Sequence, residues 1–199
     1  KWMCSNLHLT LPLAHVISPE QHQAQTQRGQ EECAEPSMLK ALELAVVQAY
    51  ERGDPRWLGL VSAWLQAVGA MRFGHLRRSE PLELTESTFY GWCSRGKQRH
   101  TRNGFKWTAP SKFLTVHFDW ASKFLIAWRK VPVPKRRRIG LVFHTTKAEP
   151  LTFKACTEVV REAMAPRVVN PEEVRIYTWR RVMPTLGVAV KLTGTELLA

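Results

Sequence analysis

Cysteine and histidine are sparse in this sequence of 199 residues, and neither is arranged as a set of metal ligands. The four cysteines, Cys4, Cys33, Cys93 and Cys156, lie far apart and form no C-x-x-C pair. The seven histidines show no H-x-x-x-H spacing. These absences exclude the usual zinc motifs and a disulfide framework, so we expect reduced thiols, no metal site and an intracellular protein.

Long apolar runs are also missing, since no stretch reaches the length of a membrane span. We therefore expect no membrane-spanning segment. The chain begins with Lys1 rather than methionine and ends within an expected helix over 195–199, so we expect a fragment cut at both ends. Because the start is missing, the lack of a targeting signal excludes nothing.

Positive charge, in contrast, is abundant, and the formal net charge is +12. Residues 1–70 carry 5 basic and 7 acidic side chains, whereas residues 71–199 carry 24 basic and 10 acidic side chains. This asymmetry predicts a polyanionic partner for the second part, most simply nucleic acid, although an inert basic surface has the same composition. For the basic run 135–138 we consider three interpretations: a contact with the DNA backbone, a nuclear localisation signal in a eukaryote, or a solvated surface.

The chain divides into a polar segment and one domain. Residues 15–36 are rich in Gln, Glu, Ser and Pro, and we therefore expect residues 1–36 to be a linker or a partly disordered segment. With 44% apolar residues the chain can build one substantial core, which we assign to residues 37–199. Ser37 is the expected cap of a helix to about Arg52, and Asp54-Pro55 starts a second helix that carries a tryptophan stripe.

The rest of the domain contains turn signals, β-formers and further helical periodicity. β-formers over 82–94 and the dipeptide Asn103-Gly104 predict a hairpin whose return strand ends at Pro110. Other expected elements are helices over 118–130 and 152–165, a short buried strand or extended segment over 139–143, and a helix start or turn at 170–173. The expected fold class is therefore mainly α with a small antiparallel β-sheet (α+β).

Two short segments each join an arginine to the end of an apolar stretch. The first, MRFGHLRR at 71–78, follows the second helix and a glycine. The second, RIYTWRRVMPTLG at 175–187, contains the pair Arg180-Arg181. A guanidinium offers donors in a planar fork that suits phosphate oxygens. Because unpaired arginine is almost never buried, we expect one arginine of this pair to face a site and the other to face solvent.

These segments resemble the two arginine-bearing signature boxes of the tyrosine recombinase (phage integrase) family. The first resembles T-G-x-R-x-x-E-L, with Arg72 at the catalytic arginine and His75 where the family has an acidic residue. The second resembles H-x-L-R-R/H-T-x-A-T, with Arg180 at the catalytic arginine and Tyr177 at the position of the usual histidine. The order of elements also matches the family's catalytic domain, incomplete at its C-terminus, over about four fifths of the chain.

The resemblance implies DNA strand cleavage and rejoining through a phosphotyrosyl intermediate, as in the integrase of a mobile element, without a metal ion or a cofactor. The resemblance implies that Arg72 and Arg180 neutralise the charge of the phosphate. It also implies that Lys97 protonates the leaving oxygen and that Tyr177 donates a hydrogen bond to the phosphate. Lys106 is the second choice for the lysine. The partner is double-stranded DNA, and a homo-oligomer on DNA is a further possibility. Additional DNA contacts are expected from Arg77, Arg78, Arg95, Arg99, Arg102 and Arg181.

Tyrosine is scarce, and the three tyrosines, Tyr50, Tyr90 and Tyr177, all precede Arg180. The family's nucleophile follows the second arginine, so we expect this chain to bind DNA without cleaving it, either because the fragment stops earlier or because the protein lost the nucleophile. The alternative is a non-catalytic basic module in which Arg72 and Arg180 contact nucleic acid independently. An RNA-binding helical protein has less support, because few exposed aromatics are expected on basic strands.

Overall fold

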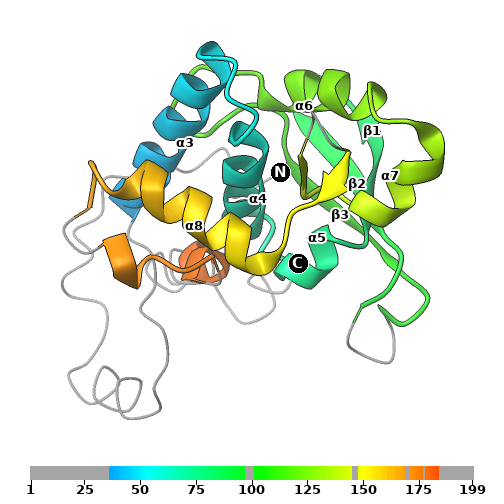
Figure 1. Cartoon of the computed structure of the whole chain (residues 1–199). Coiled ribbons are helices and arrows are strands. Elements are labelled where there is room, and N and C mark those ends of the chain that lie inside the picture. Colours follow the sequence, from blue (N-terminus) through cyan, green and yellow to red (C-terminus); the bar gives the residue numbers. More distant parts are fainter. Residues whose placement is uncertain (1–35, 97–100, 145–147, 169–170, 177, 184–199) are drawn as a thin grey trace, which may run out of the picture.

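The structure, a computed structural model, describes residues 36–96, 101–144, 148–168, 171–176 and 178–183. It has helices and a small antiparallel sheet, so the expected α+β class is confirmed. Figure 1 shows α3, α4 and α8 on one side and the sheet with α6 and α7 on the other. The elements are α3 (Pro36–Glu51), α4 (Trp57–Val68), α5 (Phe73–Leu76), β1 (Ser79–Leu84), β2 (Thr88–Cys93), β3 (Phe105–Pro110), α6 (Trp120–Arg129), α7 (Val133–Ile139), β4 (Phe143–His144), β5 (Glu149–Pro150), α8 (Phe153–Met164), η3 (Pro171–Glu173) and η4 (Thr178–Arg181).

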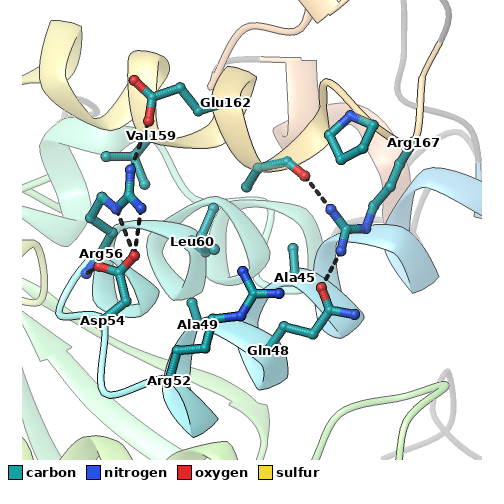
Figure 2. A pocket seen from close by; sticks show the side chains of 12 residues that line it. Ala45, Gln48, Ala49, Arg52, Asp54, Arg56, Leu60, Val159, Glu162 and Arg167 are labelled. Carbon is teal, nitrogen blue, oxygen red and sulfur yellow. Dashed lines mark hydrogen bonds and ion pairs between the residues drawn. The ribbon is translucent and has the colours of Figure 1, made fainter.

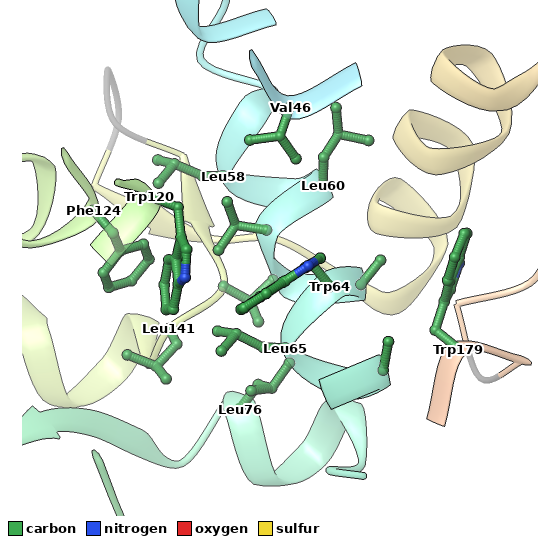
Figure 3. Packing of buried hydrophobic residues seen from close by; sticks show 14 of the residues in the cluster. Val46, Leu58, Leu60, Trp64, Leu65, Leu76, Trp120, Phe124, Leu141 and Trp179 are labelled. Atoms are coloured by element: carbon green, nitrogen blue, oxygen red, sulfur yellow. The ribbon is translucent and has the colours of Figure 1, made fainter. Parts of the chain in front are cut away.

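Helix α4 is the centre of the core. Every residue from Trp57 to Ala67 is buried, because α3, α8, η4 and the sheet pack around the helix. The tryptophan stripe predicted one buried face, whereas every face of α4 is buried. A helix that is buried on all sides belongs to the core. Figure 3 shows Trp64 between Trp120 on the sheet side and Trp179 on the α8 side, and the Trp64 and Trp120 ring centroids lie 5.1 Å apart.

A buried carboxylate joins α3 to the connection between β3 and α6. Glu43 is fully buried and accepts hydrogen bonds from the Trp64 Nε1–H at 2.8 Å and from the backbone N–H of Leu114 at 2.9 Å. Its second oxygen accepts from the Thr115 N–H at 2.8 Å, the Thr115 hydroxyl at 2.5 Å and the Val116 N–H at 3.1 Å. Five donors on one carboxylate satisfy a group that is costly to bury alone.

The three-stranded sheet has the order β1-β2-β3, with both pairs antiparallel. Strand β1 was not predicted as a separate strand, whereas the predicted hairpin is confirmed as the antiparallel pair of β2 and β3. The connection between these two strands spans 94–104, and Gly104, at φ 94°, is its last residue before β3. The expected end of the return strand at Pro110 is confirmed.

The helix predictions are confirmed with shifted ends and faces. Helix α3 begins at Pro36, before the expected cap Ser37, and α4 begins at Trp57 after a turn in which Asp54 Oδ1 accepts the Arg56 N–H. Helix α8 begins after Thr152, whose hydroxyl accepts the Ala155 N–H. Helix α6 buries Trp120, Ala121, Phe124 and Trp128, whereas Leu125 is half-buried.

The structure decides two further expectations, at 139–143 and at 170–173. Residues 139–143 are buried as expected, but Ile139 ends α7 and only Phe143 belongs to a strand, because Gly140 turns the chain at φ 58°. At 170–173 the turn alternative holds, since Pro171–Glu173 form one 3-10 turn. In the part of the chain that the structure describes, no helix is long and apolar enough to cross a membrane.

Candidate functional site

Arg72 lies where the chain leaves the core. Helix α4 ends at Val68, Gly69 caps it through a bond from its N–H to the Leu65 carbonyl, and Ala70 turns the chain at φ 47°. Arg72 is the extended residue immediately before the short helix α5 and is half-buried. The apolar helix followed by glycine thus brings Arg72 to the edge of the packed core, where its guanidinium can meet a ligand.

The turn that follows Arg72 is fixed by three other parts of the chain. The Leu141 N–H donates to the Leu76 carbonyl at 2.9 Å, and the Ser94 N–H donates to the Arg78 carbonyl at 2.9 Å. Arg77 points inward, and its Nη1 donates to the Leu151 carbonyl at 3.0 Å. Arg77 was expected to contact DNA, but in this structure its guanidinium joins α5 to the segment before α8.

Gly140 allows this close approach. It has φ 58°, and a Cβ at this position would lie 2.4 Å from the Arg77 carbonyl oxygen. Only glycine adopts such a left-handed conformation without strain, and only glycine leaves room for the backbone of α5 at this distance. The residue therefore determines how closely the link after α7 supports the turn that carries Arg72.

His75 is positioned from the sheet as well as from its own turn. Its carbonyl accepts the Ser79 hydroxyl at 2.8 Å, and that hydroxyl accepts the Trp107 Nε1–H at 3.0 Å. The half-buried imidazole packs edge-to-face on Phe105, with ring centroids 5.3 Å apart. A side chain held by both its backbone and its ring is preorganised, so little conformational entropy is lost when it binds a ligand.

Arg180 comes to the same place from the far end of the described chain. It lies in η4, whose Trp179 is fully buried and whose contacts are with α4. The Arg180 Nε–H donates to the Ala70 carbonyl at 2.9 Å, across 110 residues of sequence. Figure 1 shows α5 and the orange segment of η4 at the same lower edge of the molecule. The two arginine segments are therefore joined by a direct hydrogen bond.

Three guanidiniums act on the His75 imidazole. Burial lowers the pKa of His75 below its ordinary value, and the positive charges of Arg72, Arg78 and Arg180 lower it further. Both effects disfavour the charged imidazolium. Among the described residues, every charged group that acts on His75 in this way is an arginine. Arg72, His75, Arg78 and Arg180, here called the His75 cluster, form a positively charged site that an anion would stabilise.

Other expected site residues lie elsewhere or are not described. Arg95 and Arg102 are exposed on the connection between β2 and β3. Lys106 is exposed on β3, with its Nζ 4.1 Å from the centroid of the Tyr90 ring. Because neighbouring strand residues point to opposite faces, Lys106 points away from the Phe105–His75 contact. Lys97, Arg99, Tyr177 and the side chain of Arg181 lie outside the described residues.

A hollow between α3, the start of α4 and α8 is the other candidate, with a volume of about 200 Å³. Figure 2 shows Arg56 bonded to Asp54 and Glu162, and Arg167 bonded to Gln48 and to a backbone carbonyl. Most of its charge is therefore paired within the hollow and joins the helices. The His75 cluster is the stronger candidate, because its charges are all of one sign.

Arg72 and Arg180 were expected to act together, whereas His75 was noted only as a departure from the family pattern. The i, i+3 spacing of Arg72, His75 and Arg78 is the sequence signal that groups these residues. In the described ranges, no group of three His, Cys, Asp or Glu side chains is placed to hold a metal ion. Comparison with family models, curated proteins and solved structures found no match.

Proposed function

We propose that this chain is a DNA-binding domain of the tyrosine recombinase type, in which Arg72 and Arg180 contact one phosphodiester of double-stranded DNA. The observation that carries the proposal is the meeting of the two arginine segments. Arg180 is bonded to the carbonyl of Ala70, two residues before Arg72, and both guanidiniums act on the imidazole of His75. The net charge of +12 supports a polyanionic partner.

The arrangement suits the chemistry of a phosphodiester under attack. Negative charge on the non-bridging oxygens grows in the transition state, and fixed donors directed at those oxygens stabilise it. Arg72 and Arg180 are held at the edge of the core by α5 and η4, so their positions are set before DNA arrives. Arg78 adds a third charge, and the exposed Arg95 and Arg102 supply contacts to flanking phosphates.

The proposed function concerns binding and charge neutralisation, and no nucleophile is assigned. Tyr50 packs edge-to-face against Trp57 and Phe118, and Tyr90 lies under Lys106 on the sheet. Both tyrosines therefore belong to other surfaces than the His75 cluster. Strand cleavage and rejoining is the class of reaction that this binding serves in the family that the sequence resembles.

The test is the affinity for a labelled DNA duplex, measured by fluorescence anisotropy over a series of salt concentrations. Replacing Arg72 or Arg180 by alanine should weaken binding about tenfold or more, because a hydrogen bond to a charged group is worth about 1.5–3 kcal/mol. Arg129→Ala, at an exposed position at the end of α6, is the matched control and should change affinity only slightly.

A different pattern would contradict the proposal. If Arg72→Ala and Arg180→Ala weaken binding no more than Arg129→Ala, the two arginines are ordinary members of a basic surface. The alternative, a non-catalytic module with independent backbone contacts, would then be preferred. Circular dichroism melting of each variant separates lost binding from lost folding.

A further inference from the structure

His75 stands where an acidic residue would pair with the neighbouring arginines, and its chemistry there is different. A carboxylate next to Arg72 and Arg180 would neutralise part of their charge whether or not DNA is bound. An imidazole at the same place is neutral when the site is empty, because burial and three guanidiniums lower the pKa of His75. Histidine therefore adds no negative charge of its own next to Arg72, Arg78 and Arg180.

A bound phosphate would change the surroundings of the imidazole. The charged groups that act on His75 are Arg72 and Arg78 from its own turn and Arg180 from η4. The elements packed against it add a hydroxyl from β1, at Ser79, and an aromatic ring from β3, at Phe105, neither of which carries charge. A phosphodiester that offsets the arginines would add one negative charge to this set and favour the imidazolium form.

We infer that His75 is the proton-carrying ligand of this site: when a phosphodiester binds between Arg72 and Arg180, the imidazole takes up one proton from solvent and donates a hydrogen bond to the phosphate. The inference rests on the proposed function, since it names a third ligand for the same phosphate. Its geometric basis is the turn that begins at Arg72. The His75 N–H donates to the Arg72 carbonyl at 2.8 Å, the imidazole packs on Phe105, and the Arg180 Nε–H donates to the carbonyl of Ala70, two residues before Arg72.

The first test observes the proton directly. The Cε1–H resonance of His75 is followed by NMR against pH in the free protein and in its complex with a short DNA duplex, and the resonance is assigned from its loss in His75→Asn. The inference expects the titration midpoint of His75 to move to higher pH in the complex. A midpoint that DNA leaves unchanged, or moves to lower pH, would overturn it. The unmodified protein is measured, so the result does not depend on the folding of a variant.

The second test measures the consequence for affinity. Proton uptake on binding requires tighter binding as pH falls, by up to about tenfold per pH unit between the midpoints of the free and bound forms. His75→Asn keeps a hydrogen-bond donor but does not titrate, so its affinity should vary less with pH than that of the parent protein. His117→Asn, at an exposed position remote in sequence from the cluster, is the matched control and should retain the parent's pH dependence.

The outcomes separate this inference from the proposed function. If Arg72→Ala and Arg180→Ala weaken DNA binding but His75→Asn has the same pH dependence as the parent, the proposed function stands and the role of His75 is refuted. If neither arginine variant weakens DNA binding, the proposed function fails and the inference fails with it. If DNA raises the midpoint of His75 and His75→Asn flattens the pH dependence, both are supported.

Discussion

Replacing Glu43 by glutamine should destabilise the domain strongly, although the substitution changes only one atom of the side chain. Glu43 is fully buried and accepts all five of its hydrogen bonds. Glutamine has one acceptor oxygen and one NH₂ group. In one orientation of the amide the NH₂ group would face the donors of Trp64 and Leu114, and in the other orientation it would face those of Thr115 and Val116. At least two donors would then lose their acceptor, in addition to the opposed NH₂ group.

The magnitude follows from the number of lost bonds. Each buried donor left without an acceptor costs about 1–3 kcal/mol, and relaxation or water recovers part of this, so we expect Glu43→Gln to lower the free energy of unfolding by about 2–4 kcal/mol. Glu43→Ala should cost about 3–5 kcal/mol, because it removes the acceptor of every donor. Urea unfolding followed by tryptophan fluorescence and circular dichroism measures both values.

The control is Glu158→Gln on α8, where a largely exposed carboxylate lies 3.9 Å from Lys154. This substitution should change the free energy of unfolding by less than about 0.5 kcal/mol, because exposed ion pairs contribute little. If Glu43→Gln costs no more than Glu158→Gln, the five bonds do not hold α3 against the segment before α6. The account of that connection would then be wrong.

Two further predictions follow from the packing around α5 and α8. Gly140→Ala should lower the melting temperature more than Gly53→Ala, because both glycines have positive φ but only at Gly140 would a Cβ lie 2.4 Å from the Arg77 carbonyl oxygen, whereas nothing lies within 4 Å of a Cβ at Gly53. Equal losses would show that the backbone contact is not limiting. Burial raises the pKa of the Cys156 thiol to about 12, so in the folded protein at pH 8 Cys156 should react with a thiol reagent only as fast as the protein opens. Rapid labelling under native conditions would contradict this.

Local signals in the sequence were sufficient for most helices. Thr152 caps α8 and Asp119 caps α6 through the hydrogen bonds that these residue types favour, and helical periodicity located both segments. The face of α6 was harder to predict. Phe89 on β2 packs against Trp120 and Phe124, and Phe143 on β4 packs against Phe124. No local pattern in the sequence contains that information.

Strand β1 was missed for physical reasons that its sequence makes clear. It contains Pro81 and two glutamates, has no run of β-formers, and pairs with β2 through a register shift between Pro81 and Glu83. Its position depends on Ser79, which is buried and joined to Trp107 on β3. Contacts of this kind arise only when the sheet has formed, so propensity underestimates them.

The candidate site shows the same division between local and tertiary information. The two arginine segments were recognisable in the sequence, as was the substitution of His75 for an acidic residue. Their proximity was an expectation that rested on resemblance alone. The bond from Arg180 to the Ala70 carbonyl depends on Trp179 packing against α4. The lowered pKa of His75 depends on its burial and on the charges of three arginines from two segments that are far apart in the sequence.

The most direct test of the central claim is a double-mutant cycle on DNA affinity with Arg72→Ala, Arg180→Ala and the combined variant. If the two guanidiniums bind one phosphate, removing one of them weakens the contact of the other. The loss of binding free energy in the double variant should then differ from the sum of the two single losses by more than about 0.5 kcal/mol. Additive losses within that margin would mean that Arg72 and Arg180 contact separate phosphates, and the shared phosphate site would be refuted.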